Sequence, residues 1–296
     1  MFLLTPIILG GVPPAYVPIK VDDVTGLGST QIEGSINASS VIQATHVVNG
    51  GTDLFVLGEY PAPTLKQFKI TTPYVLPANP SVFATLAMPS STVCTDLCFS
   101  SDGMKLYVMA WYSSTNQTII QWDLSSAYSL AGRTSSNYNK TFAVPVTAWS
   151  LNTVRRLCIS DDGTKFYMAN DKSPNGTDDD VVEMALSTAH EIDTATLVGA
   201  YEVPNSNAHF YVCELIKVVG QGNQLITSYG GLVFSCSLQN GALSTISYLE
   251  QSSTAMAFGS DGGRGIGLAD DNNHLYSSLH SSSTSSYSVA TYTLPT

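Results

Sequence analysis

Hydrophobic and polar positions alternate along most of the chain in short runs separated by turn residues. In one clear example, the apolar residues 97–99 are followed by a polar turn and then by a second apolar run, residues 106–108. Runs of this length, bounded by Ser, Asp and Gly, are typical of β-strands joined by tight turns. Gly, Pro and β-branched residues interrupt every stretch that could form a long helix, so the pattern predicts an all-β protein.

The same strand–turn–strand phrase occurs twice, since residues 97–108 reappear about 60 positions later as residues 157–168. The glycine in each turn supplies a positive φ, and the aspartate before it can cap the turn with its side chain. Both copies carry this Asp-Gly pair, at Asp102-Gly103 and Asp162-Gly163.

Fainter copies of the same unit extend over most of the chain. The second strand recurs after Gly51 and Gly222, and residues 258–264 align with the turn of the best copies. Candidate third strands lie at residues 66–70, 120–125, 182–187, 232–238 and 274–279, and candidate fourth strands at 82–86, 141–144, 197–201, 244–248 and 288–292. These sets give five four-stranded units, at about 41–90, 91–145, 146–204, 205–251 and 252–296.

Repeated units of four antiparallel strands predict a β-propeller of five blades, spanning residues 41–296. A sandwich or barrel would lack a homologous unit of this size. Residues 1–40 fall outside the repeat and could form an arm or lend strands that close the ring, making a sixth blade if they contribute one. The last unit contains four candidate strands of its own, which favours the arm.

The two best units resemble the S-x-D-G-x-K-x-Y propeller repeats of bacterial surface proteins and of tailed-phage virion proteins. The matching residues are Ser100, Asp102, Gly103, Lys105 and Tyr107, then Ser160, Asp162, Gly163, Lys165 and Tyr167. The resemblance covers two blades well and three poorly. It implies a propeller, and it raises the expectation of a virion protein, although propellers carry many functions.

Composition narrows the choice of partners. The formal net charge of −11, with only 12 Lys and Arg residues in 296, argues against a nucleic-acid partner. No run approaches 18 apolar residues, so no membrane span is expected. The five cysteines show no metal or disulfide spacing and are interpreted as small buried hydrophobic residues.

Four aromatic residues and one asparagine in the predicted connections between second and third strands are the candidate binding residues. Exposed aromatic rings offer flat contact area for sugars or proteins. The alternative is that such residues simply cover the end of the core. The candidates are Tyr60, Trp111, Tyr112, Asn116 and Tyr229.

Two acidic loops are weak candidates for calcium, because clustered hard oxygen ligands suit that ion. Neither loop fits the known calcium-loop pattern, so solvated acidic loops are the simpler interpretation and no cofactor is expected. The alignment places the two loops at equivalent positions in their blades. Their candidate ligands are Asp178, Asp180, Asp270 and Asp271.

No catalytic motif emerges, and Asp96 and Glu214 are the few acids expected on inner strands. We therefore expect a non-enzymatic virion protein of a tailed phage, in the tail or on the capsid surface, present in symmetric copies. Residues 1–40 would dock on other virion proteins, and the propeller would decorate the particle or contact a host surface glycan or protein. The first alternative is a bacterial extracellular glycan-binding protein or glycoside hydrolase, which would need acids around the central channel. An intracellular lactonase-like propeller ranks last.

Overall fold

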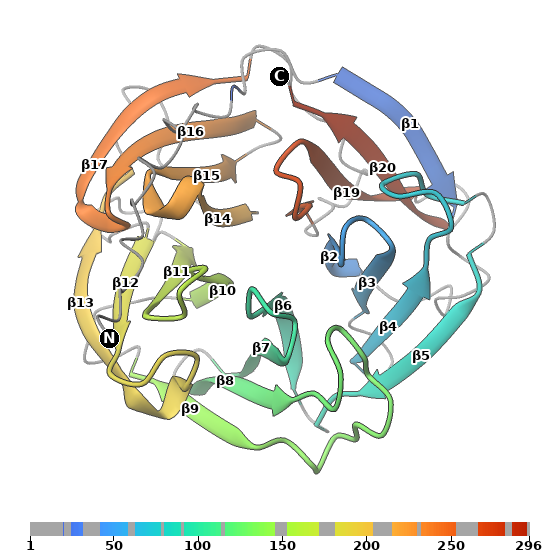
Figure 1. Cartoon of the computed structure of the whole chain (residues 1–296), viewed down its shortest axis with the longest axis horizontal. Coiled ribbons are helices and arrows are strands. Elements are labelled where there is room, and N and C mark those ends of the chain that lie inside the picture. Colours follow the sequence, from blue (N-terminus) through green and yellow to red (C-terminus); the bar gives the residue numbers. More distant parts are fainter. Residues whose placement is uncertain are drawn as a thin grey trace, which may run out of the picture.

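Five four-stranded antiparallel sheets surround a central axis in the computed structural model (Figure 1). We call them blades 1 to 5 in the order of their innermost strands. The structure describes residues 20, 25–31, 42–58, 63–77, 80–89, 92–113, 116–145, 153–171, 181–203, 215–229, 232–252, 266–281 and 286–294. The predicted five-bladed propeller is therefore confirmed.

In the first four blades, successive strands run from the channel to the rim. Blade 1 contains β2 (Ile42–Val48), β3 (Asp53–Gly58), β4 (Thr64–Lys69) and β5 (Val82–Ala87). Blade 2 contains β6 (Val93–Phe99), β7 (Lys105–Ser113), β8 (Asn116–Asp123) and β9 (Lys140–Val144). Blade 3 contains β10 (Thr153–Ile159), β11 (Lys165–Asp171), β12 (Val181–Leu186) and β13 (Ala195–Tyr201). Blade 4 contains β14 (Leu215–Val219), β15 (Gln224–Tyr229), β16 (Leu232–Gln239) and β17 (Ala242–Gln251).

Blade 5 is built from strands that come from both ends of the described chain. It contains β18 (Ile266–Leu268), β19 (His274–Ser281) and β20 (Ser286–Thr293), and its outermost strand is β1 (Thr25–Gln31), which pairs antiparallel with β20 (Figure 1). The prediction that the last unit supplies all four of its strands was therefore wrong. Residues 274–279 lie in the second strand and residues 288–292 in the third, and the fourth strand comes from within the segment 1–40.

Four residues separate the first two strands in blades 1 and 4, and five do in blades 2, 3 and 5, where the first of the five still pairs with the start of the second strand. In every blade, the next-to-last of these residues has a positive φ. Gly51, Gly103, Gly163 and Gly222 hold this position in blades 1 to 4, as the alignment of their second strands predicts. In blade 5 the position belongs to Asn272, with φ of 57°. Asparagine tolerates this conformation better than most residues, but it does not reproduce the Asp-Gly signature. The turn-like residues 258–264 precede β18, and Asp261 lies outside the described residues.

The core consists of side chains packed between neighbouring blades. Because both faces of an inner sheet region are covered by adjacent blades, β3 is buried at all six of its residues. Trp122 of blade 2 is fully buried, and its indole N–H donates to the carbonyl of Thr134 at 3.1 Å. Among the described residues, helical structure is confined to the 3₁₀ turns η2 (Ile192–Thr194) and η3 (Gly220–Gly222), and no helix there is long and apolar enough to cross a membrane.

Candidate functional site

The ring has two faces with different connections. The turns between first and second strands lie on one face together with the connections between third and fourth strands; we call it the turn face. The opposite face carries the connections between second and third strands and between blades; we call it the loop face. The predicted recognition residues Trp111, Tyr112, Asn116 and Tyr229 are at the loop-face ends of their strands.

Three of those residues lie on the β7–β8 hairpin of blade 2. The side chain of Tyr112 is 43% exposed, Trp111 is partly buried, and Asn116 is exposed opposite Ser113. The indole N–H of Trp111 is buried without a hydrogen-bond partner among the described residues. Trp111 thus fits the core-covering interpretation better, whereas Tyr112 and Asn116 are presented to solvent on a strand end.

The side chains of the other predicted residues of this face lie outside the part of the chain that the structure describes. Tyr60, Asp178 and Asp180 lie outside the described residues, as does Glu214. Tyr229 ends β15, and its side chain lies outside the described part. The recognition surface therefore remains a prediction.

A cavity of about 250 Å³ occupies the central channel. Equivalent positions on four inner strands contribute His46, Cys98, Cys158 and Lys217 to its wall. Cys98 and Cys158 are reduced and buried, and burial raises the pKa of Cys158 to about 12. Their thiols are therefore protonated at neutral pH, as expected of cysteines used for packing.

Asp96, the inner-strand acid of blade 2, ties neighbouring blades together. Its Oδ2 accepts a hydrogen bond from the backbone N–H of Leu157 in blade 3 at 2.9 Å, and its Oδ1 lies 3.4 Å from Nε2 of His46 in blade 1. The Arg156 guanidinium, also buried, donates to the carbonyl of Thr95. The carboxylate of Asp96 is 5% exposed and already engaged on both oxygens, so the geometry gives it a structural role.

Asp270 and Asp271 lie in the turn between β18 and β19, on the turn face. The alignment that made them equivalent to Asp178 and Asp180 was wrong, because residues 172–180 connect β11 to β12 at the other end of a blade. The error arose because the sequence alignment took the second strand of blade 5, residues 274–279, for its third.

Hydrogen bonds within the fold engage both carboxylates of this turn. Asp270 accepts from the Gly50 N–H at 2.7 Å and from the Tyr74 hydroxyl at 3.0 Å, and Asp271 lies 2.6 Å from Nδ1 of His274. Among the described residues, no group of three or more His, Cys, Asp or Glu side chains is arranged to hold a metal ion.

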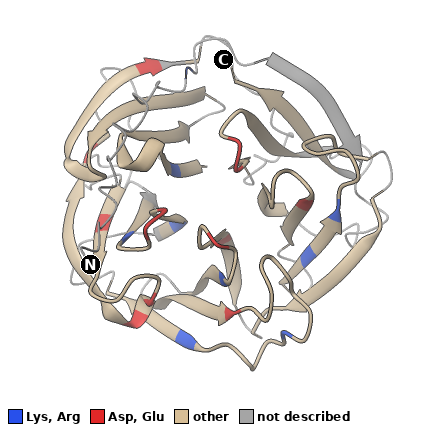
Figure 2. Cartoon of the chain, in the orientation of Figure 1, with Lys and Arg blue, Asp and Glu red and all other residues tan. Residues whose placement is uncertain are grey.

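On the turn face, the turns between the first and second strands of blades 2, 3 and 5 carry negative charge close to the channel (Figure 2). Hydrogen bonds from Ser100 Oγ and from the Met104 N–H lower the pKa of Asp102. Asp102 and its counterpart Asp162 therefore shape their own turns while adding to this charge.

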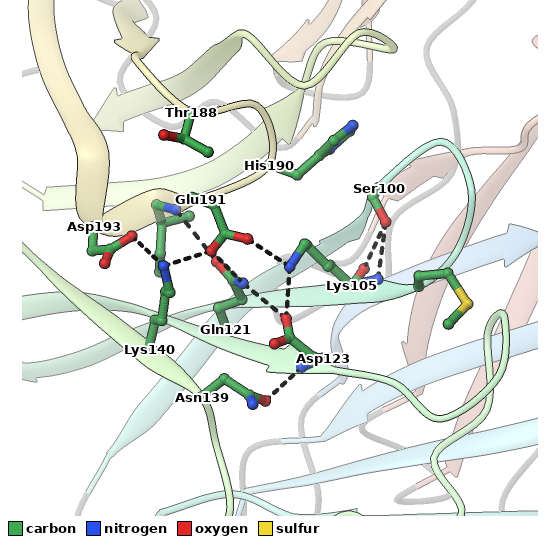
Figure 3. A network of polar contacts seen from close by, with 12 residues as sticks. Ser100, Lys105, Gln121, Asp123, Asn139, Lys140, Thr188, His190, Glu191 and Asp193 are labelled. Atoms are coloured by element: carbon green, nitrogen blue, oxygen red, sulfur yellow. Dashed lines mark hydrogen bonds and ion pairs between the residues drawn. The ribbon is translucent and has the colours of Figure 1, made fainter.

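A polar network joins blades 2 and 3 near the rim of this face (Figure 3). Lys105 Nζ lies 2.8 Å from Asp123 and 2.9 Å from Glu191, and Lys140 Nζ lies 2.6 Å from Glu191. Burial alone would raise the pKa of Glu191, but hydrogen bonds from Lys140 and Lys105 outweigh it and lower the pKa to about 2. Sequence reasoning did not single out Glu191.

A repeated acceptor on the third strand links blades 1 to 4. In each case its side-chain oxygen accepts from a backbone N–H of the next blade: Gln67 from Leu130 at 3.3 Å, Gln121 from Ile192 at 3.3 Å and Glu183 from Leu243 at 2.7 Å. The signal that could have found them is a long polar acceptor at one strand position in otherwise apolar strands. These contacts fix neighbouring blades at a constant register.

No protein-family model matches the chain, and no curated protein matches it at a significant level. A crystal structure of a functionally unknown protein from Desulfotomaculum acetoxidans is similar, with a TM-score of 0.47 and 12% identity over 81% of this chain and 79% of that one.

Proposed function

We propose that the protein is a non-enzymatic surface protein of a tailed-phage virion, whose propeller contacts a host surface glycan or protein. The observation that carries the binding role is Tyr112, an aromatic ring 43% exposed at the loop-face end of β7, in the same hairpin as the exposed residue Asn116. An exposed aromatic ring suits stacking on a sugar ring or on a partner's side chain.

Two observations favour this proposal over glycoside hydrolysis. The inner-strand acid Asp96 is engaged in contacts within the fold, and the repeats resemble those of phage virion proteins. Asp96 holds the Leu157 N–H and faces His46, so its carboxylate serves the joint between blades. The matching repeat residues, Ser100 to Tyr107 and Ser160 to Tyr167, are also structural, because they build the turns and the contacts between blades.

The docking role belongs to the N-terminal segment, and the structure narrows where it can be tested. Residues 25–31 form β1 and complete blade 5. We therefore assign attachment to other virion proteins to the residues ahead of Thr25, which can be removed without taking the strand from the ring.

Binding is tested with the full chain and two tyrosine variants. Tyr112→Ala should reduce binding to host cells or to an array of surface glycans by about tenfold, the loss expected of one well-placed aromatic contact. Tyr248→Ala is the matched control, since Tyr248 is also 43% exposed but lies on the rim strand β17. Equal binding by both variants and the unchanged chain would refute the role of Tyr112.

Attachment is tested by deleting residues 1–24. The shortened chain should fold and still bind its surface target, yet be absent from purified particles. Normal incorporation of this chain would refute the docking role, and absence of even the full chain from particles would favour an extracellular glycan-binding protein.

A further inference from the structure

Aromatic rings cover the turn glycine at three of the five joints between blades. The residues that carry them, Tyr74, Tyr128 and His190, follow the third strand of blades 1, 2 and 3 and have φ between 56° and 64°. Their rings lie so close to Gly51, Gly103 and Gly163 that a methyl group added to any of these glycines would overlap the ring. We call the residue at this position the cap residue.

Blade 4 has the same backbone at this position but no ring. Its cap residue is Gly241, with φ of 68°, whose N–H donates to the Gly222 carbonyl at 2.6 Å as the His190 N–H donates to Gly163 at 2.8 Å. The Gly241 carbonyl accepts from the Tyr167 hydroxyl at 2.7 Å. The His190 carbonyl accepts from Tyr107 at 2.8 Å in the same way.

A cavity of about 280 Å³ lies where this ring is missing, between blades 3 and 4 on the turn face. Its wall includes Ser160, Lys165 and Tyr167 from blade 3 together with Gly222 and Gly241 from blade 4. The first three are the counterparts of Ser100, Lys105 and Tyr107. Figure 3 shows His190 beside Ser100 and Lys105 at the joint of blades 2 and 3.

At the joint of blades 5 and 1, the corresponding space is filled by the ring of Tyr74. The Tyr74 ring stacks on His274, with centroids 5.1 Å apart and planes 4° apart, and its hydroxyl donates to Asp270 at 3.0 Å. In blade 3 the turn position of Asp270 belongs to Asp161, which is exposed and lines the cavity, and the strand position of His274 belongs to Lys165.

We infer that the cavity between blades 3 and 4 binds a phenol ring, which lies over Gly222, stacks against Lys165 and donates its hydroxyl to Asp161. Lys165 is held in place, since its Nζ lies 3.0 Å from Glu183 and donates to the Asn240 carbonyl at 3.1 Å. A fixed ammonium and its alkyl chain beside an aromatic ring are favourable neighbours. The ligand is either a free phenol or a tyrosine side chain of a partner; the inference does not depend on the proposed virion role.

The test uses the full chain and p-cresol, the side-chain analogue of tyrosine. Titration followed by NMR should give saturable shifts confined to residues around Gly222 and Gly241, and a crystal soaked with p-cresol should show the ring in the cavity. Toluene, which has the ring but no hydroxyl, should bind roughly tenfold more weakly because it cannot bond to the carboxylate. Equal binding of the two, or no saturable binding, would overturn the inference.

Three variants locate the site. Asp161→Ala, at an exposed position, should weaken p-cresol binding roughly tenfold and leave toluene binding unchanged, whereas Asp193→Ala, on the outer connection of blade 3, should change neither. Gly241→Tyr should place the chain's own ring in the cavity and abolish binding, which requires the Tyr167 hydroxyl to move, since it lies 2.5 Å from where the new Cβ would be. His190→Gly should open a second cavity between blades 2 and 3, where Ser101 holds the turn position of Asp161, and should therefore add a p-cresol site that is roughly tenfold weaker.

Two further readouts keep the result interpretable. A thermal unfolding curve shows whether each variant folds; if Gly241→Tyr does not, Asp161→Ala still decides the outcome. Unchanged p-cresol affinity in folded Asp161→Ala would overturn the inference. Tyrosine-containing and phenylalanine-containing peptides of the same sequence then separate a partner's side chain from a free phenol: tighter binding of the tyrosine peptide than of p-cresol assigns the site to a partner chain.

Discussion

The hydroxyl of Tyr107 in blade 2 donates a 2.8 Å hydrogen bond to the carbonyl of His190 in blade 3. Tyr167 and Tyr276 make the same bond to Gly241 and Tyr74, at 2.7 Å and 2.9 Å. Each links a second strand to the cap residue of the following blade, with Tyr276 reaching from blade 5 to blade 1. The last tyrosine of the repeated segment therefore connects one blade to the next through its hydroxyl.

Removing one of these hydroxyls should destabilise the ring. Tyr107→Phe keeps the buried ring but leaves the His190 carbonyl without this donor, which should lower the free energy of unfolding by about 1–2 kcal/mol. Tyr167→Phe should cost a similar amount, and the losses should add because the joints share no partner. Urea unfolding measures both, and Tyr248→Phe, at an exposed position, is the control. No loss in either joint variant would contradict the role of the tyrosines.

Asp96 offers a second test of how the inner strands are held together. Asp96→Ala removes the acceptor of the buried Leu157 N–H and should lower the free energy of unfolding by about 2 kcal/mol. Asp96→Asn retains one acceptor oxygen and should lose less. Chemical denaturation of the two variants side by side gives the comparison, and a fully stable Asp96→Ala protein would show that the bond to Leu157 contributes nothing.

Low pH should weaken the joint between blades 2 and 3, because it protonates the carboxylate of Glu191. The pKa of this carboxyl falls from an ordinary value of 4.5 to about 2 in the folded protein. A depressed folded pKa stabilises the fold above the unfolded pKa, and that stabilisation disappears as the pH falls from about 4.5 toward 2. We expect a contribution on the order of 1–3 kcal/mol at neutral pH.

Glu191→Gln isolates this effect. The stability difference between the unchanged chain and the variant should be large at pH 6 and shrink steadily toward pH 2, as measured by urea unfolding across that interval. A difference that stays constant with pH would show that the carboxylate charge is not what Lys105 and Lys140 stabilise.

Two N-terminal deletions test the closure of the ring. Removing residues 1–24 leaves β1 intact and should leave the melting temperature nearly unchanged. Removing residues 1–40 deletes the partner of β20 and exposes its edge, which should lower the melting temperature by about 5 °C or more and promote aggregation. Equal stability of the two shortened chains would contradict a structural role for β1.

The sequence was informative wherever a local rule determines the structure. A tight turn with a positive φ at its next-to-last residue selects glycine, so Gly51, Gly103, Gly163 and Gly222 marked the turns of four blades correctly. Asn272 fills the same position in blade 5 without that signature, and the alignment there moved to the wrong segment.

Two features depended on contacts that sequence spacing does not reveal. The partners in the β1–β20 pairing, such as Thr30 and Val289, lie at opposite ends of the chain, and β1 contains two glycines that weaken its strand pattern. The cavity beside Gly241 became visible only when the cap residues of four blades could be compared in space.

The most direct test of the proposed virion role is a density map of the assembled phage particle. We expect five-bladed rings in symmetric copies on its surface, with the residues ahead of β1 in contact with another structural protein and the Tyr112 end of blade 2 facing outward. Particles whose map accounts for every surface protein without this ring would contradict the virion role, and so would a ring that faces the particle interior.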